Sequence, residues 1–196
     1  MILFVMLSSL ELLRAQSLRE TRTLDLLDQQ RNVSVHVIVS VPSHVDLSML
    51  YVFLSGAGVA ATEYQWLTDI PTVAVAQVAV PPWPVYPQCG RGDGGLCTDS
   101  TYVAFVDQRS AYHKRCAADL AFAAAYLRAS ASHDAQSLLH GRLKGRVLLG
   151  GHSWGGGYSL QASSLLKCAA AGTAPAVLVI TPFPCCSQLS LTPPPS

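Results

Sequence analysis

The sequence predicts an α/β protein whose mostly parallel sheet is covered by helices on both faces. Runs of apolar and β-branched residues, typical of strands buried on both sides, alternate with segments of helical periodicity. Glycine clusters stand where two of the expected strands meet expected helices. Hydrophobic residues make up 50% of the 196 residues and charged residues only 13%, which is typical of a globular chain with a large interior.

The first expected elements form a β-hairpin. Every second residue from 33 to 41 is valine, which is the two-residue period of a half-buried strand, so His36 is expected to face outward. Residues 21–27 are expected to pair with this strand across the polar, turn-like segment 28–32.

A strand–helix–strand unit is expected next. Residues 50–55 form an apolar run that stops at Gly56-Ala57-Gly58, and residues 62–70 suit a short helix. Residues 72–80 are apolar and β-branched and end at two prolines. They are expected to form a second buried strand, parallel to the first.

A longer helix and a second unit of the same kind complete the pattern. After a loop rich in Gly, Pro and Cys at 81–100, residues 112–128 are expected to be helical. A strand at 146–149, a helix to about Cys168 and a strand at 176–180 then follow. The expected buried face of the 112–128 helix carries Cys116, Leu120, Ala123 and Leu127.

Composition narrows the classes of partner. The formal net charge of +1 gives no electrostatic footprint for nucleic acid, and no uninterrupted apolar run approaches the ~18 residues of a membrane span. None of the six cysteines lies in a C-x-x-C pair or near histidines at zinc-ligand spacing, so no metal site is expected. Cys89 and Cys97 flank a glycine-rich loop, and the sequence leaves open whether they form a disulfide.

The chain is expected to contain one domain, at 21–186, between an N-terminal segment at 1–20 and a proline-rich tail at 187–196 that cannot continue a sheet. Residues 1–13 are apolar, as in a signal peptide, but they contain Glu11 and lack a basic start and a good cleavage site. The location of the protein therefore stays open, with secretion as one alternative.

Residues 151–155 carry the strongest pattern in the chain. They read Gly-His-Ser-Trp-Gly, a G-x-S-x-G that follows an expected strand and precedes an expected helix. A serine in this context sits on a tight, strained turn, and Gly151 and Gly155 avoid collisions with the neighbouring backbone. The turn exposes the serine hydroxyl, so we interpret Ser153 as a nucleophile.

Two backbone groups are expected to face this hydroxyl. The N–H of Trp154, at the start of the following helix, is the expected first donor to a developing oxyanion. The N–H of Ala57, in the glycine turn after an earlier strand, is the expected second donor. His152 is adjacent to the serine and faces away around the turn, so we expect it to pack or hydrogen-bond under the turn rather than to act as base.

Two stretches of the chain resemble a known family. Residues 151–160 read GHSWGGGYSL and residues 180–183 read ITPF. They resemble the α/β-hydrolase superfamily and, within it, the cutinases, polyester (PET) hydrolases, chlorophyllases and dienelactone-hydrolase-like enzymes. The resemblance implies hydrolysis of small-molecule or lipid-like carboxylic esters through an acyl-enzyme, without a cofactor, and it places Phe183 and Trp154 against the substrate.

Weaker similarities extend toward the N-terminus. Residues 28–42 look like the first hairpin of the family, residues 55–58 like its oxyanion loop, and residues 115–127 like a helix whose acid is Asp119. The chain departs from the family pattern at three positions, which are Ser55 for the usual His, Trp154 for Met and Phe183 for Trp. The resemblance therefore does not transfer the substrate class.

The triad of this fold is not complete in the sequence. Its acid and its base follow the nucleophile along the chain, whereas no Asp, Glu or His follows Ser153. We therefore expect a hydrolase domain that is incomplete at its C-terminus. His113, His133 and His140 precede the nucleophile and are expected to be solvated at the surface.

A catalytically inactive remnant of a hydrolase, acting as an interaction module or without function, is the main alternative. A sheet that stops after the strand at 176–180 would have an unpaired edge, which favours self-association.

A dinucleotide-binding oxidoreductase is a second alternative. Residues 56–61 read GAGVAA and fit G-x-G-x-x-A between a strand and a helix. That motif also needs an acid near the end of the next strand, where this chain has Gln77. The match is therefore weak.

Overall fold

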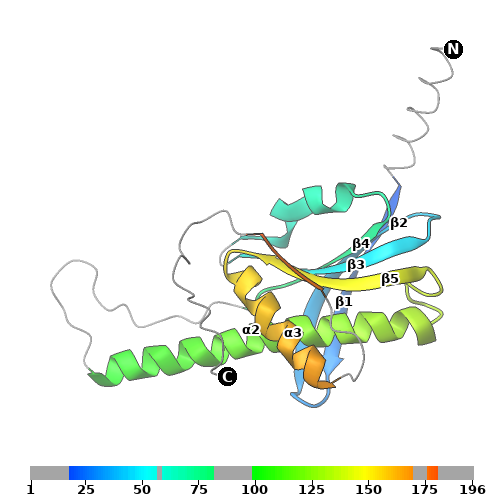
Figure 1. Ribbon diagram of the computed structural model, residues 1–196. Helices are drawn as coiled ribbons and strands as arrows, with labels where there is room; N and C mark the ends of the chain where they lie inside the picture. The colour runs from blue at the N-terminus through cyan, green and yellow to red at the C-terminus, as the bar shows by residue number, and fades with distance from the viewer. Residues whose placement is uncertain (1–17, 57–58, 82–98, 170–175, 181–196) are drawn as a thin grey trace, which may run out of the picture.

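The computed structural model describes residues 18–56, 59–81, 99–169 and 176–180 (Figure 1). The described strands form one six-stranded sheet in the order β1-β2-β4-β3-β5-β6. This mixed sheet with helices on both faces confirms the predicted fold class.

The N-terminal hairpin has the predicted form. β1 (Arg19–Asp28) and β2 (Val33–Pro42) pair in antiparallel register, and β2 also pairs antiparallel with β4. The valines of β2 from position 35 onward are buried, whereas His36 is exposed and its Nδ1 lies 2.8 Å from Asp25 Oδ1. The outward orientation predicted for His36 is therefore confirmed.

The remaining strands are parallel. β3 (Leu47–Leu54) pairs with β4 (Val73–Val78) on one side and with β5 (Leu143–His152) on the other, and β5 pairs with β6 (Ala176–Ile180). Every residue of β4 is buried, as expected for a central strand covered on both faces. Both predicted strand–helix–strand units are thus present.

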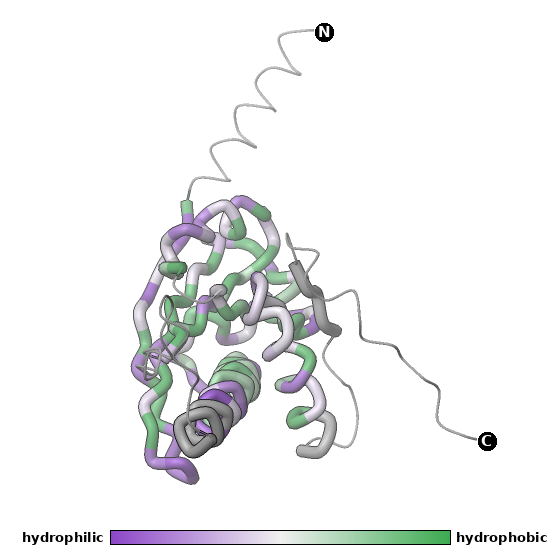
Figure 2. The backbone as a smooth tube through the Cα atoms, turned by 90° about the vertical axis from the view of Figure 1, so that its left-hand side faces the viewer, coloured by the Kyte–Doolittle hydropathy of each residue, from purple (hydrophilic) through white to green (hydrophobic). Residues whose placement is uncertain are grey.

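Two helices cover one face of the sheet, and a short helix covers the other. α2 (Asp99–His133) and α3 (Trp154–Ala169) lie side by side on the first face, as the end-on view of α2 in Figure 2 shows. The short helix η1 (Ala61–Asp69) lies on the opposite face (Figure 1). The predicted face of α2 is buried in the larger core, including Leu120, Leu127 and the free thiol of Cys116.

Two helices differ from their predicted form. η1 is a 3₁₀-helix with a kink at Tyr64, and its N-cap position, Ala60, makes no side-chain capping bond. α2 begins at Asp99, although the sequence predicted a loop to residue 100 and a helix from residue 112. Because the first turns of α2 extend past the sheet (Figure 1), residues 107–111 are mostly exposed and show no apolar period. None of the described helices combines the length and the apolar character needed to cross a bilayer.

Candidate active site

The G-x-S-x-G segment forms a sharp turn between β5 and α3. β5 ends at His152 and α3 begins at Trp154, so Ser153 is the single residue between them. Its φ of 55° lies in the left-handed region, which a residue with a side chain occupies only under strain. This combination of strand, strained serine and helix is the geometry that exposes a nucleophile at the end of a strand.

The two outer glycines of the turn are packed against backbone. A Cβ on Gly151 would overlap the backbone of Gly155, and a Cβ on Gly155 would overlap the carbonyl oxygen of Leu54 in β3. Any larger residue at either position would force the turn or the strand beside it to move. The glycines therefore allow the elbow to sit directly against the end of β3.

The hydroxyl-bearing residue lies at the N-terminal end of α3. Ser153 is partly exposed, and its carbonyl oxygen accepts a hydrogen bond from the N–H of Gly156 at 3.1 Å. Trp154 is the first residue of α3, where backbone N–H groups point out of the helix toward its N-terminal end. This end of a helix stabilises negative charge, as an oxyanion donor must.

The indole of Trp154 is held between two side chains of α2. The Arg109 guanidinium carbon lies 4.5 Å from the centre of the indole, and the His113 ring meets the indole edge-on at 5.0 Å. His113 also packs against the ring of Tyr158 at 5.2 Å. These contacts connect α2 directly to the residue that follows Ser153.

The prediction that His113 is solvated at the surface is therefore wrong. Its Nε2 is buried without a hydrogen-bond partner among the described residues, and burial, with Arg109 nearby, lowers the pKa of the imidazole. The sequence did hold a signal, because residue 113 lies one turn before Cys116, in line with the buried face of α2. His133 and His140 are exposed, as predicted.

His152 takes part in a hydrogen-bonded link beneath the elbow. Its Nδ1 lies 2.9 Å from the hydroxyl of Tyr64 in η1, and the same hydroxyl accepts the N–H of Gly56 at 3.2 Å. The predicted hydrogen bonding of His152 under the turn is confirmed. No short-range pattern indicates Tyr64 as its partner, because the two residues are 88 positions apart.

Two of the predicted site residues lie outside the described residues. They are Ala57, the expected second oxyanion donor, and Phe183, the expected substrate contact. The cysteines at 89 and 97 lie outside the described residues as well.

The environment of Gly56 also explains the dinucleotide-like motif. A Cβ at this position would lie 2.9 Å from His152 Nδ1 and 3.5 Å from the Tyr64 hydroxyl. The close backbone approach that glycine permits is therefore made to the protein's own side chains. In addition, η1 is a 3₁₀-helix, whereas the dinucleotide fold presents an α-helix N-terminus to the pyrophosphate.

Asp119, the acid that the resemblance placed on the 115–127 helix, is buried in an ion-pair network. Its Oδ1 accepts a hydrogen bond from Arg31 Nη1 at 2.6 Å, and Arg115 Nε lies 3.7 Å from its Oδ2. Arg31 Nε also binds Asp28 Oδ2 at 2.6 Å. Burial raises the pKa of Asp119 despite these cations, whereas the hydrogen bond from Arg31 lowers the pKa of Asp28. The network ties the hairpin turn to α2.

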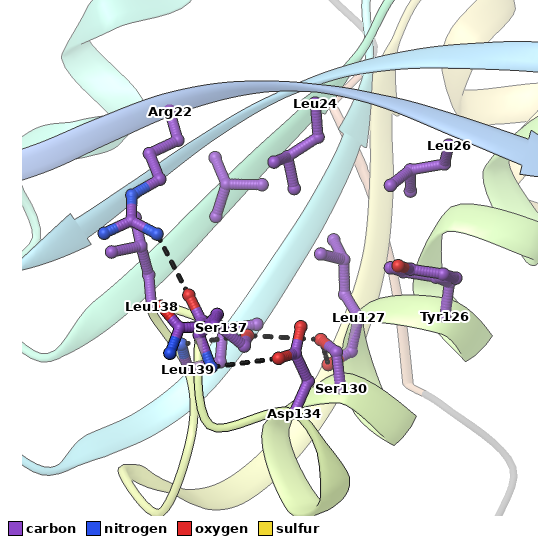
Figure 3. Close-up of a pocket in the computed structure, with 12 residues that line it drawn as sticks. Arg22, Leu24, Leu26, Tyr126, Leu127, Ser130, Asp134, Ser137, Leu138 and Leu139 are labelled. Carbon is purple, nitrogen blue, oxygen red and sulfur yellow. Dashed lines mark hydrogen bonds between the residues drawn. The ribbon is translucent and has the colours of Figure 1, made fainter.

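A pocket of about 90 Å³ lies between the N-terminal hairpin and the C-terminal end of α2 (Figure 3). Its polar groups largely satisfy each other, since Ser130 Oγ lies 3.2 Å from Ser137 Oγ and Asp134 accepts the N–H of Gln136 at 2.9 Å. Neither Ser153 nor Trp154 lines it. It is therefore separate from the elbow.

Comparison with known proteins identifies relatives by structure only. No protein-family model and no curated protein sequence matches the chain. A bacterial heroin esterase has a TM-score of 0.52 and 15% identity, over 89% of this chain and 49% of the esterase. The esterase Est22 has a TM-score of 0.51 and 14% identity, over 79% of this chain and 40% of the esterase.

A third similar structure is brefeldin A esterase, described as a bacterial homologue of human hormone-sensitive lipase, with a TM-score of 0.46 and 19% identity. The chain spans less than half the length of each of these three esterases. At these identities the likeness concerns the fold. The strand order, the parallel strand that enters the elbow and the two matches above a TM-score of 0.5 together show that this chain has the α/β-hydrolase fold.

Proposed function

We propose that this chain carries the nucleophile of a serine hydrolase that cleaves carboxylic esters through an acyl-enzyme. The observation that carries the proposal is the φ of 55° at Ser153, between the end of β5 and the start of α3. A strained turn at this place in an α/β sheet has the geometry of a nucleophile elbow. The esterase activity of the structural neighbours supports the proposal.

The reaction would proceed in two steps. Ser153 Oγ attacks the ester carbonyl carbon while a base removes the hydroxyl proton, and the N–H groups of Trp154 and Ala57 stabilise the resulting oxyanion. The bond to the alcohol oxygen then breaks, the alcohol leaves with the proton, and the acyl group stays on Ser153. A water molecule repeats the attack on the acyl-enzyme and releases the acid.

The substrate would be a small-molecule or lipid-like ester that contacts Trp154 and Phe183. Trp154 directly follows Ser153 and is partly exposed, and Arg109 and His113 hold its indole in place. The narrower similarity to cutinases, polyester hydrolases and chlorophyllases rests on the motif residues at 151–160 and 180–183.

A catalytically inactive hydrolase fold that serves as an interaction module is the second candidate. This candidate applies to these 196 residues taken by themselves, in which no Asp, Glu or His follows Ser153 to supply the usual acid and base. Removal of triad members typically lowers the rate about 10⁴- to 10⁶-fold.

A fluorophosphonate probe distinguishes the two candidates. We expect slow labelling of the wild-type chain at Ser153, located by peptide mass mapping, and no labelling of Ser153→Ala. Ser164→Ala serves as the matched control, because Ser164 is an exposed serine on α3, the helix that follows Ser153, and this variant should label as the wild type does. Equal labelling of Ser153→Ala and the wild type would refute the proposed nucleophile, and no labelling of either would favour the inactive fold.

A further inference from the structure

The hydroxyl of Tyr64 connects the two backbone segments between which an ester would react. One is the elbow, because His152, which the hydroxyl meets at 2.9 Å, immediately precedes Ser153. The other is the loop after β3, because the hydroxyl accepts the N–H of Gly56 at 3.2 Å. Tyr64 belongs to neither segment, since it lies in η1.

The ring that carries this hydroxyl is well fixed. Tyr64 is buried, and its ring packs against Phe53 of β3 with centroids 4.7 Å apart. Phe53 in turn meets Tyr51 at 5.8 Å in the same small core. A hydroxyl on a ring that packing holds in place can therefore fix the position of the backbone group to which it is hydrogen-bonded.

The proton arrangement of the link follows from its geometry. The Tyr64 oxygen accepts a proton from Gly56 N–H, so its own single proton is available for His152 Nδ1. All three groups are satisfied when the ring proton of His152 lies on Nε2 and Nδ1 is left as an acceptor. The imidazole then acts as an acceptor for Tyr64.

The described residues that flank positions 57 and 58 are hydrogen-bonded. Gly56 N–H is held by Tyr64, and Gly56 C=O accepts the N–H of Val59 at 3.2 Å. Ala57, the proposed donor, stands between Gly56 and Val59 in the sequence. Because a Cβ on Gly56 would lie 2.9 Å from His152 Nδ1, the loop backbone also lies directly against the imidazole.

We propose that Tyr64 and His152 are positioning residues that fix the backbone of Gly56, two residues after the end of β3, relative to the Ser153 elbow. Gly56 directly precedes Ala57, the expected oxyanion donor, in the sequence. The inference rests on the proposed function for its effect on reactivity. A displacement of about 1 Å in such a site can lower a rate about 100-fold. Neither residue would touch the reacting atoms.

Tyr64→Phe tests the proposal against a matched control, Tyr51→Phe. Both substitutions remove one hydroxyl from a buried tyrosine of the same core, but the hydroxyl of Tyr51 has no hydrogen-bond partner among the described residues. We expect Tyr64→Phe to lower the second-order rate constant of fluorophosphonate labelling about 10- to 100-fold. Tyr51→Phe should label at the wild-type rate.

Two variants of His152 separate positioning from simple packing. His152→Asn places a side-chain oxygen where it can replace Nδ1 as acceptor, whereas His152→Leu removes the acceptor. We expect labelling to be restored toward the wild-type rate in His152→Asn relative to His152→Leu. Equal rates for the two variants would overturn the role of the hydrogen bond.

Amide hydrogen exchange in peptides covering residues 55–59 gives a readout that does not require a reactive serine. Exchange at Gly56 should be faster in Tyr64→Phe than in the wild type and in Tyr51→Phe. The melting temperature of Tyr64→Phe should first show that the variant is folded. If it is folded, an unchanged exchange rate would overturn the proposal. Faster exchange combined with an unchanged labelling rate would overturn it as well. If Ser153 is not labelled even in the wild type, the proposed function fails, and the exchange result still decides whether Tyr64 anchors the loop.

Discussion

Tyr51 fills the space that a side chain on Gly150 would need. The Tyr51 ring and hydroxyl of β3 lie against the α-carbon of Gly150 in the adjacent strand β5, so that a Cβ there would overlap them. Gly150 stands three residues before Ser153 on the strand that leads into the elbow. The packing of a tyrosine in β3 thus accounts for one of the glycines that surround Ser153.

Gly150→Ala should therefore destabilise the fold. The added methyl group would overlap the rigid Tyr51 ring, and overpacking of this kind costs about 1 to 3 kcal/mol of the free energy of unfolding. Denaturation in urea measures the change. Gly157→Ala is the control, because a Cβ on that helical glycine meets no atom within 4 Å. It should be neutral or should stabilise by up to about 1 kcal/mol, and a comparable loss in both variants would contradict the explanation.

Tyr51→Phe should leave the free energy of unfolding near neutral pH unchanged or slightly higher. The Tyr51 hydroxyl is buried without a hydrogen-bond partner among the described residues. Burial of an unsatisfied hydroxyl costs about 1 to 3 kcal/mol, so its removal can raise the free energy of unfolding by at most that amount. Tyr64→Phe, which loses two hydrogen bonds, should be the less stable of the two variants. A larger loss in Tyr51→Phe would indicate a hidden partner for that hydroxyl.

Tyr51 should also make the free energy of unfolding depend on pH in the alkaline range. Burial raises the pKa of Tyr51 from 10.0 to about 12, so its phenol ionises in the unfolded chain before it does in the folded protein. The wild type should therefore lose free energy of unfolding as the pH rises from 10 to 12, and Tyr51→Phe should lose less. Urea denaturation at several pH values measures both slopes, and parallel slopes would contradict the prediction.

Asp28→Asn should destabilise the hairpin turn in a pH-dependent way. Asp28 accepts hydrogen bonds from Arg31 Nε at 2.6 Å and from the N–H of Gln30 at 3.0 Å, and its pKa is lowered in the folded protein. The contribution of Asp28 to the free energy of unfolding is therefore fully present above the ordinary carboxylate pKa of about 3.9. It is lost as the pH falls through the lowered pKa of the folded protein. We expect a loss of about 1 to 3 kcal/mol at pH 7.

The difference in the free energy of unfolding between Asp28→Asn and the wild type should become smaller below pH 4. A difference that does not change with pH would show that the charge of Asp28 plays no part. Asp25→Asn is the control. Asp25 lies in the same hairpin, but its contact with His36 is exposed, so its loss should change the free energy of unfolding by less than about 1 kcal/mol.

Imidazole in solution should increase the reactivity of Ser153. No histidine follows Ser153 within these 196 residues, and a base is needed to remove the proton from Oγ. The rate of fluorophosphonate labelling should therefore rise in proportion to the concentration of neutral imidazole. Ser153→Ala should show no such increase, and an imidazole-independent rate in the wild type would indicate that a residue of this chain already serves as base.

The sequence by itself determined the order and type of the main elements. The valines at every second position of β2 and the apolar runs of β3 and β4 depend on local periodicity, and local periodicity reports which side of a strand is buried. The elbow could likewise be predicted from neighbouring residues, because a strained turn between a strand and a helix needs small residues within a few positions of Ser153.

Only the tertiary structure decided which side chains surround that turn. Tyr64 and His152 are 88 positions apart, as are Arg31 and Asp119, and no short-range pattern specifies such a pair. The position of His113 against Trp154 likewise depends on how α2 and α3 pack together. Contacts between distant segments are set by the packing of whole elements. Residue spacing therefore predicted the strained turn at Ser153, whereas the side chains that hold its neighbours could be identified only in the folded chain.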